Sequence, residues 1–259
     1  MIQNNNLSPL PFYGSMDEQM HRRSYAYGDV FPLFAQKGKL PAINVPVPTG
    51  TTTMTLLVYK ASGAPTPLPY LTIMTKPFDG FEVAYFGGTS GGPSEVGQYY
   101  CVLSGGGMTL YSDIFTVVDD ITAYLKVEWW NDDDLVMDGG AIVSSQHNYV
   151  YLNTQLGKPE YEFEEEGEKR DGLFFPEKMI SEKTYKFNFL ANEPLCDVMR
   201  FVRMADHIRI TDRYSNVYNA DTFLMTPKWE VQGNIASVEA EFQTAVVAKR
   251  VGRNFTTIS

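Results

Sequence analysis

Short runs of alternating apolar and polar residues fill most of this chain, and glycine and proline separate them. Residues 51–118 contain several such runs, which are rich in β-branched and aromatic residues: TTTMTLLVYK, PYLTIMTK, FEVAYFGG, GQYYCVLSGG and MTLYSDIFTVV. A period of two residues with turn signals between the runs is typical of β-strands. Short strands at this regular spacing predict an immunoglobulin-like β-sandwich over residues 51–118.

The C-terminal residues 119–259 show the same period of two. In YKFNFLA, for example, Tyr185, Phe187 and Phe189 alternate with polar residues, which predicts a strand with one aromatic face. Together with the strands that follow it, this segment indicates a β-barrel or β-sandwich.

A single segment of this region, at about residues 192–206, has helical spacing instead. Asn192 is a suitable N-cap, and Pro194 is tolerated in the first helical turn. Apolar residues at i, i+3, i+4 and i+7 predict a buried stripe formed by Leu195, Val198, Met199 and Val202. We therefore predict one α-helix lying across the C-terminal β domain.

Residues 1–50 have a different pattern, because proline recurs throughout them. Proline removes a backbone donor and blocks both helix and central strand. We predict an extended arm that packs on its own domain or on a neighbouring subunit. The aromatic residues expected to make these contacts include Phe12, Tyr13, Tyr25 and Tyr27.

Residues 160–172 read EYEFEEEGEKRDG and place six glutamates within nine positions. The glutamates alternate with Tyr161 and Phe163, so the period of two again indicates a strand. We predict a half-buried strand with a turn at Gly167. A disordered acidic tail and a catalytic or metal-binding carboxylate cluster are the competing interpretations. The carboxylates are expected to be solvated or paired with Lys169, Arg170 and Lys186.

Composition narrows the class of protein. Hydrophobic residues make up 44% and aromatic residues 14% of the chain, which excludes a disordered polypeptide. No run approaches the roughly 18 apolar residues of a membrane span, and the N-terminus has no signal-peptide pattern, so we expect no membrane insertion. The two cysteines, Cys101 and Cys196, are too few for a disulfide framework and are expected to be buried free thiols.

The net charge of −10 is concentrated in one segment. Residues 119–171 contain 14 acidic and 4 basic residues, whereas the segments on either side are close to neutral. Such a segment is either a solvated face or a surface that repels a polyanion. No cluster of lysine and arginine indicates sequence-specific binding of nucleic acid. The acidic surface that we predict consists of Glu160, Glu162, Glu164, Glu166, Asp132 and Asp133.

No pattern of catalytic or metal-binding residues is present in the sequence. The three histidines, His21, His147 and His207, lack the spacing of metal ligands, and no nucleophile elbow, phosphate-binding loop or dinucleotide fingerprint occurs. We predict no catalytic residue, no metal and no cofactor. A calcium loop at residues 131–140, with Asn131, Asp133 and Asp138 as candidate ligands, is an alternative that lacks the spacing and terminal glutamate of an EF-hand. A hydrolase using acids of residues 160–168 lacks histidine, cysteine or serine partners.

Trp129 and Trp130 are adjacent on a predicted strand, so their side chains point to opposite faces. One of them is expected in the core. The other is a candidate for stacking on a sugar ring or for a subunit contact, and the sequence leaves open which tryptophan has which role.

Three segments of the chain resemble structural proteins of tailed phages and prophages of Bacteroides-type gut bacteria. They are LSPLPFYGSMDEQMHRRSYAYGDVFPLF, KPEYEFEEEGEKRDGLFFPEKMISEKTYKFNFLA and LCDVMRFVRMADHIRITDRYSNVYNADTFLMTPKWEVQGNIASVEAEFQT. The order of strand, strand, helix and strands in residues 158–247 is also similar to the β-barrel-plus-helix unit of tail-tube, tail-hub and distal-tail proteins. The resemblance spans most of the chain.

This resemblance implies a non-enzymatic component of a phage tail or baseplate. Such a protein is made in the cytoplasm of the bacterial host and is carried in the virion tail. Its expected partners are further copies of itself, in a ring around the DNA channel, and other tail proteins. DNA would pass near the acidic residues without being bound in a sequence-specific way. An adhesin-like or carbohydrate-binding β-sandwich module is the alternative.

Overall fold

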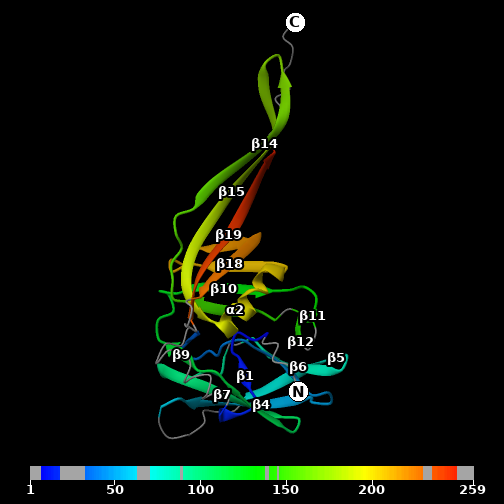
Figure 1. Ribbon diagram of the computed structural model, residues 1–259, viewed down its shortest axis with the longest axis vertical. Helices are drawn as coiled ribbons and strands as arrows, with labels where there is room; N and C mark the ends of the chain where they lie inside the picture. Colours follow the sequence, from blue (N-terminus) through cyan, green and yellow to red (C-terminus); the bar gives the residue numbers. More distant parts are fainter. Residues whose placement is uncertain are drawn as a thin grey trace.

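The protein has a mainly-β fold, which confirms the predicted fold class, with a helix in its C-terminal half. Figure 1 shows this computed structural model. The residues that it describes are 7–17, 33–62, 71–87, 90–137, 140–144, 146–229 and 235–249.

Most strands belong to one 13-stranded sheet. Its path runs β17-β16-β10-β13-β2-β9-β7-β4-β5-β6-β3, and β8 pairs with both β7 and β1. Its members are β1 (Phe12–Tyr13), β2 (Phe34–Gln36), β3 (Ile43–Val47), β4 (Thr53–Lys60), β5 (Leu71–Phe78), β6 (Phe81–Phe86), β7 (Gly97–Gly105), β8 (Met108–Ser112), β9 (Phe115–Val118), β10 (Leu125–Trp130), β13 (Asn148–Leu152), β16 (His207–Thr211) and β17 (Val217–Ala220).

Two smaller sheets complete the fold. A four-stranded sheet has the order β14-β15-β19-β18, and a two-stranded sheet joins β11 to β12. Their bounds are β11 (Leu135–Met137), β12 (Gly140–Ile142), β14 (Glu160–Arg170), β15 (Leu173–Asn192), β18 (Thr222–Trp229) and β19 (Ile235–Lys249). The inner face of the four-stranded sheet presents Phe187, Phe223 and Phe242 to the core, as the alternation in YKFNFLA predicts.

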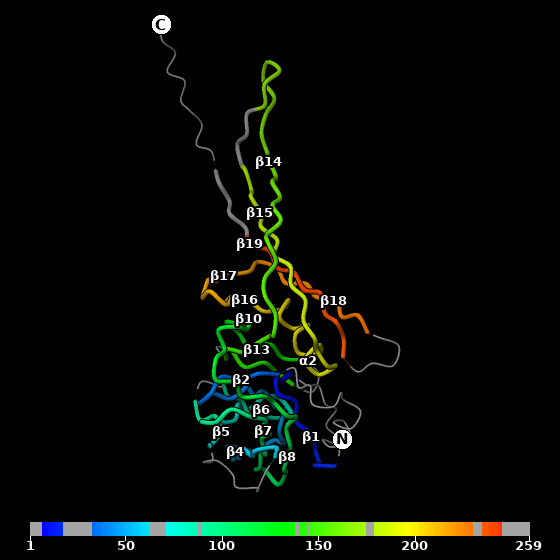
Figure 2. Tube along the Cα trace, turned by 90° about the vertical axis from the view of Figure 1, so that its left-hand side faces the viewer, coloured from blue at the N-terminus to red at the C-terminus, as the bar shows by residue number. Residues whose placement is uncertain are grey.

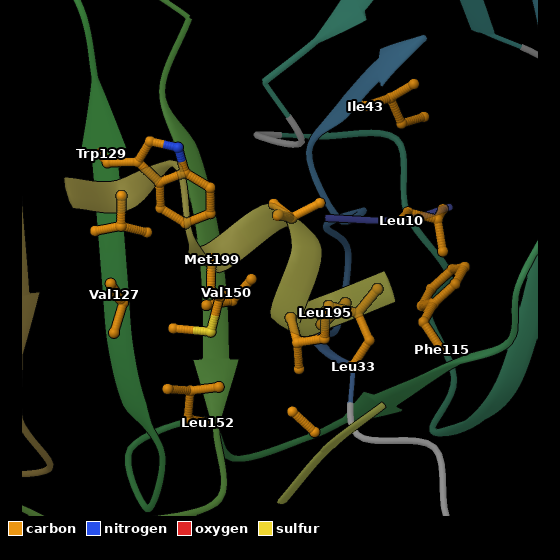
Figure 3. Packing of buried hydrophobic residues seen from close by; sticks show 14 of the residues in the cluster. Leu10, Leu33, Ile43, Phe115, Val127, Trp129, Val150, Leu152, Leu195 and Met199 are labelled. Atoms are coloured by element: carbon orange, nitrogen blue, oxygen red, sulfur yellow. The ribbon is translucent and has the colours of Figure 1, made fainter. Parts of the chain in front are cut away.

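One hydrophobic core continues through both predicted β domains. Figure 3 shows the C-terminal helix between Trp129 and Val150 on one side and Leu10 and Phe115 on the other. Strand β2 joins the two halves of the sheet, since Phe34 pairs with Tyr151 of β13 and with Thr116 of β9. The domain boundaries at residues 50 and 118 and the immunoglobulin-like assignment stay predictions.

The described part of the predicted arm belongs to the body of the protein. Phe12 and Tyr13 are buried and pair as β1 with Ser112 and Tyr111 of β8, so their contacts are within the chain. Residues 34–36 and 43–47 form β2 and β3, so an extended arm through residue 50 is wrong for these positions. Their backbones pair with β9, β13 and β6, which satisfies their hydrogen-bonding groups. Tyr25 and Tyr27 lie outside the described residues.

The C-terminal helix α2 (Glu193–Met199) begins as predicted but ends early. The side chain of Asn192 accepts a hydrogen bond from the backbone N–H of Leu195 and caps the helix. After Met199 the chain tightens into the 3-10 helix η1 (Val202–Met204), because the N–H groups of Phe201 and Met204 bond three residues back. The predicted apolar stripe is buried, including Val202.

Both cysteines are buried free thiols, as the sequence predicts. Burial raises the pKa of Cys196 to about 11, and burial also raises the pKa of Cys101 well above its ordinary value. Neither thiol is therefore ionised near neutral pH, which suits a packing role.

Asp212 organises the turn between β16 and β17. Its carboxylate accepts hydrogen bonds from the backbone N–H of Tyr214 at 2.8 Å and of Asn216 at 2.9 Å, and from the hydroxyl of Tyr218 at 3.2 Å. Partial burial raises the pKa of Asp212, but these hydrogen bonds outweigh it and hold the pKa below the ordinary 3.8. The ionised carboxylate thus stabilises the turn.

Replacing Asp212 with alanine is expected to lower the free energy of unfolding by about 1 kcal/mol at neutral pH. Because the folded-state pKa is lowered, the stabilisation is complete above the unfolded pKa of about 4 and is lost as the pH falls through the folded pKa. Urea denaturation at pH 7, 5 and 3 measures this. The exposed Asp133 supplies the control variant, Asp133→Ala. A stability difference that stays constant down to pH 3 would contradict the prediction.

Candidate interaction surfaces

The acidic stretch forms one strand of a long hairpin that projects from the body (Figures 1 and 2). We call residues 160–183 of this hairpin the ribbon. Strand β14 pairs with β15 along its whole length, and a register shift lies between Glu166 and Gly167. The turn is at Asp171 and Gly172, which have φ angles of 51° and 82°, so the predicted turn at Gly167 is wrong. Gly167 marks a β-bulge instead.

The strand assignment is confirmed, but the predicted half-burial is wrong. Every residue of β14 is exposed, and among the described elements none packs over either face of this strand. The alternation of charge and aromatic residues is nevertheless preserved in space. Glu160, Glu162, Glu164 and Glu166 share one face of the ribbon, which we call the acidic face.

The opposite face of the ribbon carries Tyr161 and Phe163, which are 57% and 64% exposed. Tyr161 lies directly across from Lys183, whose ammonium is 5.6 Å from the tyrosine ring centre. Two residues further along β15, Tyr185 is already buried in the body on this same face. The sheet face that is buried in the body at Tyr185 therefore continues onto the ribbon, where no other part of the described chain covers it.

Two ion pairs of the four-stranded sheet involve ribbon acids among the side chains that the structure describes, and both are exposed. Lys186 lies 2.7 Å from Glu160, and the hydrogen bond between them raises the pKa of Lys186. Arg170 donates to Glu168 at 2.8 Å, as predicted for this arginine. Exposed pairs of this kind contribute little stability.

Asp132 and Asp133 belong to the loop between β10 and β11. Figure 1 shows these two strands in the body, away from the ribbon. Asp132 is 3.0 Å from His207, and its backbone N–H donates to Asp206. The predicted acidic surface is therefore divided between two places in one chain. Over the described residues, no group of three His, Cys, Asp or Glu side chains is arranged to hold a metal ion, and Asp138 of the candidate calcium loop lies outside them.

The two tryptophans lie on opposite faces of β10 and one of them is in the core, as predicted. Trp129 is buried in the core and is 1% exposed. The ring of Trp130, on the opposite face of β10, is stacked with His147 at 4.4 Å and with His207 at 5.0 Å. His207 begins β16 and His147 directly precedes β13, and these two strands lie on either side of β10, so the imidazoles cover both faces of the indole. A sugar ring would have to displace one imidazole to stack on Trp130.

Glu128 lies beside this stack, on the same face of the sheet, and is only 9% exposed. Its carboxylate is 3.1 Å from Lys126, 3.2 Å from His147 and 3.9 Å from Arg209. The guanidinium of Arg209 also lies over the Trp130 ring, 4.8 Å from its centre. A buried carboxylate with three cationic or protonatable neighbours is a built polar cluster, because an unpaired charge in this position would be costly.

A pocket of about 80 Å³ opens beside Glu128. It is lined by Lys39, Gly87, Lys126, Glu128, His147, Tyr149 and Tyr151. Burial raises the pKa of both tyrosines, so both are neutral. We call the surface formed by Lys39, Lys126 and Arg209, with His147 and His207 beside them, the cationic face. Its residues come from strands β10 and β16 and from the segments that contain Lys39 and His147, which are distant in sequence, and no spacing within one segment predicts it.

No protein-family model matches the chain, and no curated protein matches it. Among solved structures, one match is the "Crystal structure of Dpr2 Ig1-Ig2 in complex with DIP-Theta Ig1-Ig3", with 7% sequence identity and a TM-score of 0.16. The alignment covers 88% of this chain and 95% of that chain. A TM-score this low assigns neither a topology nor a function. In the part of the chain that the structure describes, no helix is long and apolar enough to cross a membrane.

Proposed function

We propose that this chain is a non-enzymatic structural component of a phage tail or baseplate. In this proposal it assembles into an oligomeric ring around the DNA channel and also contacts other tail proteins. The observation that carries the proposal is the ribbon, whose aromatic face is exposed at Tyr161 and Phe163 although its pattern is that of a covered sheet. Exposed apolar surface next to polar residues marks protein interaction sites.

Assembly with other molecules explains the exposed aromatic side chains of the ribbon better than a monomeric protein does. A hairpin of this length, projecting from the body with aromatic side chains in water, gains stability only when another molecule covers it. The resemblance to phage structural proteins indicates that this assembly is part of a tail or baseplate. The acidic face is suited to a channel surface, because it would repel DNA that passes along it. The carbohydrate-binding alternative has less support, since both faces of Trp130 are occupied by histidines.

The test is the mass of the purified protein by light scattering over a wide range of concentrations, with rings sought by electron microscopy. We expect a defined oligomer for the wild-type protein. The double variant Tyr161→Ser/Phe163→Ser is expected to dissociate at a concentration at least tenfold higher, because about 2 kcal/mol or more of apolar burial is lost per contact.

The control is Tyr214→Ser, which removes a 70% exposed tyrosine from the β16–β17 turn, away from the ribbon. It should leave the oligomer unchanged. Circular dichroism confirms that each variant subunit is folded. A wild-type protein that stays monomeric at every concentration would overturn the ring proposal, as would an oligomer that is indifferent to the ribbon variant.

A further inference from the structure

We infer that the acidic face of the ribbon of one copy docks on the cationic face of a second copy, with a ribbon glutamate carboxylate in the pocket beside Lys39, Lys126 and His147. This inference rests on the proposed function, since it names the surface that the ribbon meets within the assembly.

Two residues of the acidic face, Glu162 and Glu164, carry charges that no described side chain neutralises in an ion pair. Glu162 lies directly across from Glu182 in the β14–β15 register, and like charges in this position destabilise a sheet. Among the residues that the structure describes, neither Glu162 nor Glu164 has an ion-pair partner, whereas Glu160 is paired with Lys186. An external cation would relieve this repulsion.

The ribbon glutamates also determine how two copies can associate, either by pairing of their β14 edges or by docking on a different surface. Strand β14 is the outer strand of its sheet, so its free edge is a template for pairing with another strand. Pairing two β14 edges would bring two rows of glutamates together, which is unfavourable. The glutamates therefore favour contact with a cationic surface and disfavour pairing with β14 of another copy.

The cationic face offers the positive charge that the ribbon glutamates would contact, although the net charge of the chain is −10. Glu128 is the one carboxylate lining the pocket, and Lys126 and His147 already contact it. Lys39 lines the same pocket, and none of the described carboxylates forms an ion pair with it. The ammonium of Lys39 is thus available for a further carboxylate.

The pocket has room for one small group. Its volume of about 80 Å³ is far below the roughly 300–1,000 Å³ of a site for a whole small-molecule ligand. It corresponds to roughly two or three water molecules, which is the size of a carboxylate group. Tyr149 and Tyr151 in its wall offer apolar surface to the stem of a glutamate side chain.

The contact must be between copies. The ribbon projects away from its own body (Figure 2), whereas the cationic face is formed by residues of β10 and β16 and by Lys39 and His147 within the body. A ribbon that meets a different surface on the next copy makes a head-to-tail contact, and repeated contacts of this kind close into a ring or extend into a filament. Complementary charge gives such a contact its register and its dependence on salt.

Charge reversal on each surface provides the test. The ribbon variant is Glu162→Lys/Glu164→Lys, and the pocket variant is Lys39→Glu. Each variant alone is expected to raise the dissociation concentration of the oligomer at least tenfold, measured by analytical ultracentrifugation. When the two variants are mixed, each ribbon can meet a pocket of opposite charge on the other variant, so the two variants are expected to associate with each other with an affinity near that of the wild-type contact.

Matched controls carry the same charge changes elsewhere. Glu95→Lys/Asp119→Lys reverses two carboxylates that are each 73% exposed, and Lys37→Glu reverses an exposed lysine two residues from Lys39. Both should assemble normally. If the two variants do not associate when mixed, or if either charge variant alone assembles normally, the docking contact is overturned. If the docking contact is overturned but the Tyr161→Ser/Phe163→Ser variant still dissociates, the proposed function stands without the docking contact. If the wild-type protein is monomeric, both the proposed function and the docking contact are overturned.

Discussion

Replacing Phe242 with alanine is expected to lower the free energy of unfolding by about 3–5 kcal/mol. The Phe242 side chain is fully buried at the centre of the aromatic layer between β19 and β15. Its ring centre lies 5.1 Å from that of Tyr185, 5.9 Å from that of Tyr218 and 6.5 Å from that of Phe187. Truncation removes these contacts and leaves a cavity that rigid neighbouring rings cannot fill.

Urea denaturation followed by circular dichroism measures this loss. Phe163→Ala is the matched control, because it makes the same substitution on a strand of the same sheet at a side chain that is 64% exposed. Under conditions where the protein is monomeric, its effect on unfolding should be within about 0.5 kcal/mol of zero. A loss of less than 1 kcal/mol at Phe242, or an equal loss at both sites, would contradict the structure.

Gly92→Ala is expected to cost about 1–3 kcal/mol of stability and to displace the loop that carries Lys39. A Cβ atom at residue 92 would lie 2.0 Å from the carbonyl oxygen of Lys39, which is a contact with backbone. The N–H of Gly92 donates to the carbonyl of Gly38, and the N–H of Gly38 donates to the carbonyl of Pro93. The two loops therefore cannot separate without breaking hydrogen bonds.

The measurements are the urea midpoint and the assembly of the folded variant. Gly14→Ala is the control, since a Cβ at residue 14 meets nothing within 4 Å and its φ angle is not positive. If the cationic face receives a ribbon, Gly92→Ala also weakens the oligomer. An unchanged midpoint for Gly92→Ala would show that the approach of these two loops is looser than described.

The sequence by itself determined the local features of this protein. Alternation predicted the strands, including β14, and the spacing around Leu195 predicted helix α2 with Asn192 as its cap. Adjacency placed Trp129 and Trp130 on opposite faces. These features depend on interactions within a few residues, and propensity, period and capping encode such interactions directly.

Only the tertiary structure decided which faces are covered and which distant residues meet. Phe163 and Phe187 both alternate with polar residues along a strand, yet Phe163 is 64% exposed and Phe187 only 3%. The difference arises because other elements of the fold bury Phe187, and a period of two does not specify which elements pack on a strand. The prolines before residue 50 likewise did not reveal that β2 and β3 pair with distant strands. Glu128, His147 and Arg209 meet because the register of β10 against β13 and β16 aligns them, and register is a property of the paired strands rather than of any one segment.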